Sequence, residues 1–198
     1  LISVALSSTP NHPKYYYLRA SLNFYDRLFR SSGIENQELL KLVAENAQKA
    51  IDYAEERDET VENKFYLGAS HDFLCRAQVL LERSVYDGFS SARKSKKYLE
   101  EVIEENPDFY DAYLGLAVLE YFSSTRLTSW WQEFVAWISG MSGEKEKAME
   151  YFHLVEEKGK LRKTEAQFIL ATLYRFLEAN PDKASEYITG FISKHPQN

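Results

Sequence analysis

Asn106-Pro-Asp-Phe-Tyr-Asp-Ala-Tyr-Leu-Gly-Leu-Ala117 is the stretch of this chain that decides its fold. A proline disfavours helical geometry in the residue before it, so the apolar-periodic segment that precedes Pro107 must end at Asn106. A second apolar-periodic segment starts at Phe109, only two residues beyond the proline, and its apolar residues recur with helical spacing. The stretch therefore predicts two helices joined by a short turn.

The same alternation of helix and short break extends in both directions from this turn. Apolar residues with a period near 3.6 predict helices over residues 13–29, 36–56, 60–85, 90–105, 109–122, 143–158, 163–177 and 182–194. Asp87-Gly88 is a turn signal between the third and fourth of them, and Asn180-Pro181 separates the last two. Residues 128–140 predict a short additional helix with a stripe of bulky apolar side chains.

The composition favours the same all-α fold. The 198 residues include only 8 glycines and 5 prolines, too few turn signals for a fold of many strands. Residues 13–198 are expected to form a single domain, and residues 1–12 an N-terminal arm or the remnant of a trimmed export signal. The compartment, cytoplasmic or exported, stays open, since the lone Cys75 does not report on redox conditions.

Two segments carry a resemblance to a known family. Asn106–Ala117 resembles the junction between two tetratricopeptide repeats, and Glu165–Pro196 resembles one nearly complete repeat. The resemblance implies a right-handed helical solenoid of about four antiparallel helix pairs with a Trp-rich helical insertion, most similar to bacterial tetratricopeptide proteins of unassigned biochemistry. The spacing from Gly68 to Ser90 departs from the regular repeat of about 34 residues. A shared function is not implied by a shared repeat.

In such solenoids the first helix of each pair lines a concave face. Projection of these helices predicts a mostly aromatic groove that binds a partner, made of Tyr17, Phe24, Phe65, Phe73, Val118, Tyr121, Phe122, Phe168, Arg175 and Phe176. An exposed apolar stripe of this size is unusual in a monomer, so we expect other groups to bury it. Three possibilities stay open: an apolar segment of a partner, the chain's own Trp-rich segment, and closer helix packing that makes the rings part of the core.

The Trp-rich segment is the second candidate for partner binding, through Trp130, Trp131, Phe134 and Trp137. A membrane-surface role is disfavoured, because the segment lacks the Lys and Arg residues that accompany interfacial helices. Packing of the segment onto the rest of the domain stays open.

Catalytic and metal signatures are weak. His71 and Cys75 are four residues apart on one predicted helix, but two ligands do not make a zinc site, so a buried thiol and a hydrogen-bonded imidazole are expected. No Gly-rich phosphate loop, HExxH motif or nucleophile elbow is present. The sequence thus predicts no catalytic residue, no metal and no cofactor.

The function expected from these features is a non-catalytic scaffold that binds a protein or peptide partner through the apolar groove. A net charge of −6 argues against nucleic acid as that partner. Two alternatives stay open. One is a small-molecule or enzymatic pocket around Tyr17, Phe73, Tyr121 and Arg175, and the other is a self-associating unit that forms homo-oligomers.

Overall fold

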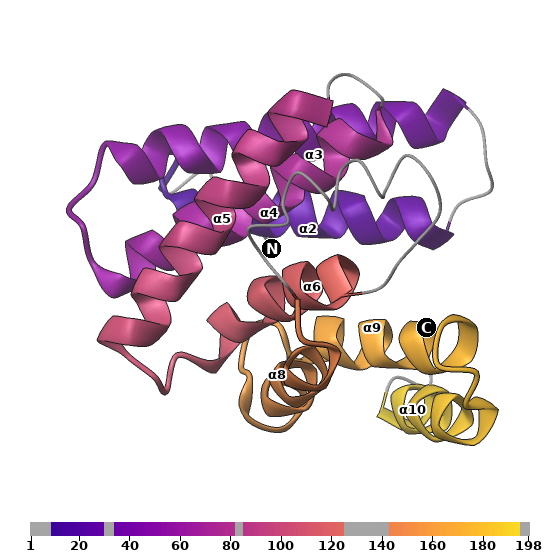
Figure 1. Cartoon of the computed structure of the whole chain (residues 1–198). Coiled ribbons are helices and arrows are strands. Elements are labelled where there is room, and N and C mark those ends of the chain that lie inside the picture. Colours follow the sequence, from indigo (N-terminus) through magenta and orange to yellow (C-terminus); the bar gives the residue numbers. More distant parts are fainter. Residues whose placement is uncertain (1–8, 30–33, 82–84, 125–142, 195–198) are drawn as a thin grey trace.

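The computed structural model describes residues 9–29, 34–81, 85–124 and 143–194, and every regular element in these ranges is a helix (Figure 1). The all-α prediction is confirmed for this part of the chain. The elements are α2 (Pro13–Phe29), α3 (Ile34–Glu55), α4 (Val61–Leu80), α5 (Val85–Glu105), the 3-10 turn η1 (Tyr110–Ala112), α6 (Tyr113–Ser124), α8 (Lys145–Lys158), α9 (Lys163–Phe176) and α10 (Pro181–Lys194).

Each helix packs against the next one along the chain, from α2 through α10, and α2 also contacts α4 (Figure 1). Two apolar cores result. The first joins α2, α3, α4 and α5, and the second joins α6, α8, α9 and α10. Helix α6 belongs to both, because Leu116 lies in the first core while Leu114 and Ala117 lie in the second. The two groups of helices are therefore joined through α6.

Local signals place α4, the central helix of the first core. The Oγ1 of Thr60 accepts a hydrogen bond from the backbone N–H of Asn63 at 3.1 Å, which caps the first turn. The side-chain amide of Asn63 donates to the carbonyl of Ala54 at 2.6 Å, at the end of α3. These two bonds fix the α3–α4 turn and hence the position of α4.

The turn predicted at Asp87-Gly88 is wrong, since α5 already begins at Val85 and runs through both residues. A Cβ atom at position 88 would lie 2.9 Å from Cγ2 of Val79 on α4. The missing side chain of Gly88 therefore allows α4 and α5 to approach each other closely, and Gly88 does not form a turn. The third helix also ends earlier than predicted, at Leu80.

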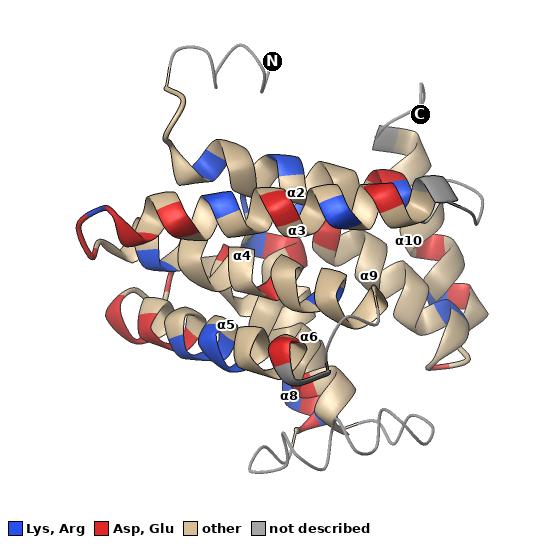
Figure 2. Ribbon diagram, turned by 90° about the horizontal axis from the view of Figure 1, so that it is seen from above, with Lys and Arg blue, Asp and Glu red and all other residues tan. Residues whose placement is uncertain are grey.

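Acidic and basic residues both occur along α3 and α5, where they are coloured red and blue in Figure 2. Lys64 of α4 forms ion pairs with Glu101 and Glu105 of α5, and Lys97 lies 3.8 Å from Glu101. No helix among the described residues is long and apolar enough to span a membrane.

Candidate binding cavity

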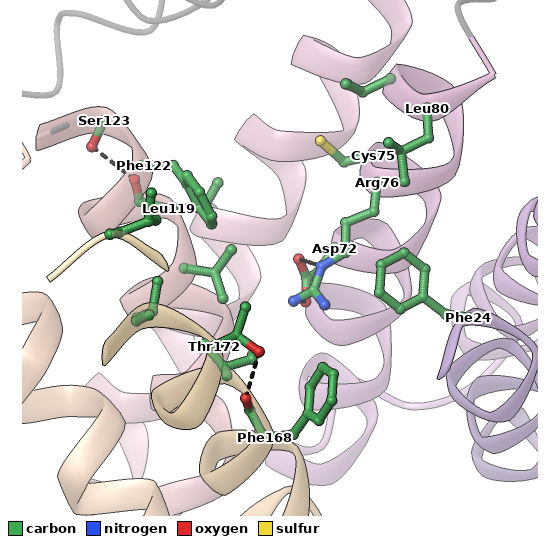
Figure 3. A pocket seen from close by; sticks show the side chains of 15 residues that line it. Phe24, Asp72, Cys75, Arg76, Leu80, Leu119, Phe122, Ser123, Phe168 and Thr172 are labelled. Carbon is green, nitrogen blue, oxygen red and sulfur yellow. Dashed lines mark hydrogen bonds and ion pairs between the residues drawn. The ribbon is translucent and has the colours of Figure 1, made fainter. Parts of the chain in front are cut away.

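Helices α2, α4, α6 and α9 surround a cavity of about 300 Å³ (Figure 3). Its walls are predominantly apolar. Phe24 comes from α2, Val79 and Leu80 from α4, and the apolar side chains of α6 and α9 complete the walls, namely Val118, Leu119, Phe122, Phe168, Ile169 and Leu173. These four helices are the ones that the repeat resemblance makes the first members of their pairs.

One polar pair, Asp72 and Arg76, faces this apolar space (Figure 3). The Nε of Arg76 donates to Oδ1 of Asp72 at 3.0 Å and its Nη2 donates to Oδ2 at 2.7 Å. The guanidinium also lies against the rings of Phe24 and Phe73, at 5.4 and 5.1 Å from their centroids. The fork-to-fork geometry and the two rings hold Arg76 in one orientation.

A second ion pair lies behind the first, in the interior. Arg162, only 1% exposed, donates from Nε and Nη2 to the two carboxylate oxygens of Glu165, both at 2.8 Å. The same Nη2 donates to Oδ2 of Asp72 at 3.1 Å, so that α4 and the start of α9 are joined. Two arginines and two carboxylates give a buried network without net charge, which we call the charge network: Asp72, Arg76, Arg162 and Glu165.

The carboxylate of Asp111 in η1 positions Arg162. It accepts hydrogen bonds from three consecutive backbone N–H groups, those of Lys160, Leu161 and Arg162, at 3.0, 3.0 and 2.8 Å. The loop that enters α9 therefore has its amides satisfied by one side chain of the turn that enters α6. This fixes the backbone from which Arg162 reaches inward.

The electrostatic environment favours the charged forms of Glu165, Arg76 and Arg162 and the neutral form of the Cys75 thiol. Burial alone would raise the pKa of Glu165, but the charges of Arg162 and Arg76 and the hydrogen bonds to the carboxylate together outweigh it and hold that pKa below its usual range. Burial raises the pKa of Cys75, in the cavity wall, to about 12. A thiol with such a pKa supplies almost no thiolate at neutral pH, and it is a poor nucleophile.

The residues predicted to line the groove fall into three groups: some line the cavity, some lie outside it and some are buried in the two cores. Phe24, Val118, Phe122 and Phe168 line the cavity. Arg175 and Phe176 do not line it. Phe176 is 71% exposed, and the Arg175 guanidinium lies over its ring at 5.6 Å.

The expected exposure is wrong for Tyr17, Phe65, Phe73 and Tyr121, which are buried in the two cores. The physical reason is ring packing. The ring of Tyr17 contacts those of Phe65 and Phe73 at centroid distances of 5.9 and 5.8 Å. Helix packing therefore covers this part of the predicted stripe. The alternative pocket around Tyr17, Phe73 and Tyr121 is likewise part of the core.

The second set of predicted binding residues, Trp130, Trp131, Phe134 and Trp137, lies outside the described residues. The expectation of a hydrogen-bonded His71 is wrong for the described chain, in which neither ring nitrogen has a partner. His71 does not line the apolar cavity, whereas Cys75 does. No three His, Cys, Asp or Glu side chains of the described ranges are grouped as a metal site.

Sequence reasoning missed the charge network. One local signal was available, since Asp72 and Arg76 are opposite charges four residues apart within a mostly apolar stretch of α4. Arg162 and Glu165, three residues apart, form a similar pair. No sequence pattern connects the two pairs, because Arg162 and Asp72 are 90 residues apart.

No protein-family model matches the chain, and a search of the curated proteins finds no significant match.

Proposed function

We propose that this chain is a tetratricopeptide-like solenoid that acts as a non-catalytic binding module, and that its cavity receives the apolar side chains of a partner protein segment. The helix order supports the solenoid part of the proposal, because successive helices pack in sequence and the cavity lies between α2, α4, α6 and α9. Concave faces of helical repeats are extended binding surfaces.

The observation that carries the binding proposal is the continuity of apolar surface from the cavity wall to solvent. Leu80 and Leu177 line the cavity and are 42% and 41% exposed. Water in contact with such a surface is released when an apolar group covers it, at a gain of roughly 25 cal/mol per Å². An amphipathic helix in an apolar groove is the recognition mode with this chemistry.

The polar groups of the cavity support binding rather than catalysis. Asp72 is held by Arg76 and Arg162, so its lone pairs already serve the charge network. The thiol of Cys75 stays protonated. Neither group is thereby available as a ready base or nucleophile.

Affinity capture from a lysate of the source organism tests the proposal. The bait is the wild-type chain, compared with Val118→Asp, which places a charge in the cavity wall, and with Leu22→Asp, whose parent side chain is 58% exposed and does not line the cavity. We expect one protein to be retained by wild type and Leu22→Asp and lost with Val118→Asp. Equal capture by all three folded variants, checked by circular dichroism, contradicts the proposal.

A small apolar molecule is a second candidate occupant, favoured by the volume of the cavity. About 300 Å³ between four helices is at the lower end of the range for ligand pockets. Native mass spectrometry of the purified chain separates the two candidates. A co-purified apolar molecule that is absent from Val118→Asp supports the small ligand, and bare wild-type protein argues for the protein segment.

A further inference from the structure

The side chain of Phe176 is the most exposed large hydrophobic group of the described residues, at 71%. Phe176 lies in the last turn of α9, four residues after Thr172 and seven after Ile169, and both of these residues line the apolar cavity. Residues at this spacing share one face of an α-helix. Phe176 therefore continues the cavity-lining face of α9 outward, past the end of the cavity.

The apolar cavity opens to solvent at the same end of α9. Leu177, the residue after Phe176, and Leu80 at the end of α4 line the cavity and are 41% and 42% exposed. We call the edge that these two leucines form the cavity mouth. The exposed ring and the cavity mouth thus belong to one apolar surface.

The cavity has the size and the walls to hold a phenyl ring. Its volume is about 300 Å³, and an apolar cavity of about 150 Å³ already holds a benzene molecule. The rings of Phe24, Phe122 and Phe168 come from three different helices and surround the space (Figure 3). Aromatic rings pack favourably edge to face, so an aromatic side chain is the apolar group that suits these walls.

A surface with both a projecting ring and a matching cavity is complementary to itself. The ring of Phe176 does not line the cavity of its own chain. In a dimer with two-fold symmetry the same patch of both subunits meets, so every contact forms twice. The ring of one copy then enters the cavity of the other, and the reverse contact forms with it.

The distribution of charge allows two copies to meet at the cavity mouth, although each carries a net charge of −6. Five acidic residues flank the start of α4, namely Glu55, Glu56, Asp58, Glu59 and Glu62. Helix α4 has 20 residues, so this acidic end lies roughly 29 Å along the helix from Leu80 at the mouth. That length is well beyond the Debye length of about 8 Å in physiological salt. Repulsion between the acidic ends of two copies is therefore largely screened.

We propose that the apolar cavity of one copy receives the Phe176 side chain of a second copy, so that two chains form a symmetric dimer. This inference rests on the proposed function, because it identifies the partner segment of the same cavity as the end of α9. Two phenyl rings of about 150–250 Å² each, with the walls and leucine edges that they cover, give an interface near the lower limit for stable complexes, about 1,200 Å². We therefore expect a reversible dimer.

Sedimentation velocity of the full chain, from micromolar to millimolar concentration, tests the proposal. We expect a monomer–dimer equilibrium for wild type. Phe176→Ser removes the ring and should weaken dimerisation at least about thirtyfold, as the loss of an interface hot spot does. Ile192→Ser is the matched control, since Ile192 is 57% exposed and does not line the cavity. Its dimerisation should equal that of wild type.

A mixture of two variants tests whether the contact is reciprocal. Val118→Asp blocks the cavity with a charge but keeps the ring, whereas Phe176→Ser keeps the cavity. Neither variant forms either contact with itself, but a mixed pair forms one of the two. The mixture should therefore associate more strongly than each variant alone and more weakly than wild type. Leu80→Asp at the cavity mouth replaces Val118→Asp if circular dichroism shows that the latter does not fold.

Three results overturn the dimer. The first is a wild-type chain that stays monomeric at every concentration, and the second is equal dimerisation of wild type and Phe176→Ser. The third is a mixture that associates no more strongly than its separate variants. A monomeric wild type whose capture of another protein is still lost with Val118→Asp would overturn this inference alone and leave the proposed function standing.

Discussion

The carboxylate of Asp111 accepts a hydrogen bond from the backbone N–H of Arg162 at 2.8 Å, across 51 residues of sequence. This contact joins the start of α6 to the start of α9. It also sets the backbone that carries Arg162 toward Asp72. The apolar cavity is thus bounded by helices whose relative position depends on a polar contact outside it.

Replacing Asp111 by Ala should lower the free energy of unfolding by about 3 kcal/mol, because three backbone N–H groups at or near the interior lose a charged acceptor. Urea denaturation followed by circular dichroism measures the change. Asp108→Ala is the matched control, since Asp108 is exposed and accepts from Tyr110 at the surface. A loss equal to that of the control would show that the loop amides find other acceptors.

The charge network predicts that removing one partner of a buried ion pair costs more stability than removing both partners. Arg162→Met should destabilise the fold by about 3–5 kcal/mol, because Glu165 stays buried and loses its two hydrogen bonds to Arg162. Its one remaining cationic contact among the described residues is the longer one to Nη1 of Arg76, at 3.4 Å. The double variant Arg162→Met with Glu165→Leu should be less destabilised than the first variant alone. Thermal unfolding of both variants checks this order, and the opposite order would contradict the argument.

Two phenylalanines of the predicted groove should respond differently to replacement by Ser. Phe73 is completely buried between the rings of Tyr17 and Phe24, so its loss should cost about 3–5 kcal/mol or prevent folding. Phe176 is mostly exposed, so its loss should change stability by less than about 0.5 kcal/mol. Denaturation midpoints of the two variants decide whether the assigned burial is correct.

His71 should make stability depend on pH in the acid range. Its pKa is lowered in the folded chain from 6.5 to about 4, so between these values the unfolded chain binds a proton that the folded chain does not. Stability must then fall as the pH falls from 6.5 toward 4, by up to about 3 kcal/mol. His71→Gln should flatten this limb in urea titrations at a series of pH values, whereas His153→Gln, at a less buried histidine, should flatten it less.

The sequence by itself determined the helices and most of their ends. Pro107 acts on its immediate neighbour, so the end of α5 at Glu105 follows from local sterics. Pro181 likewise suits the first turn of a helix, and it begins α10. The amphipathic periods that predict an all-α chain are also local, since each depends on residues within a few turns.

The tertiary structure decided which residues on each helix are buried in a core and which border the cavity. Phe24 and Phe73 belong to the same predicted stripe, yet Phe24 borders the cavity while Phe73 lies in the core, because Tyr17 and the arginines of the charge network pack around it. Gly88 marks a helix contact and not a turn, because Val79 approaches it from α4. Such outcomes depend on which distant side chains fill the same space, and the order of residues along one helix does not contain that information.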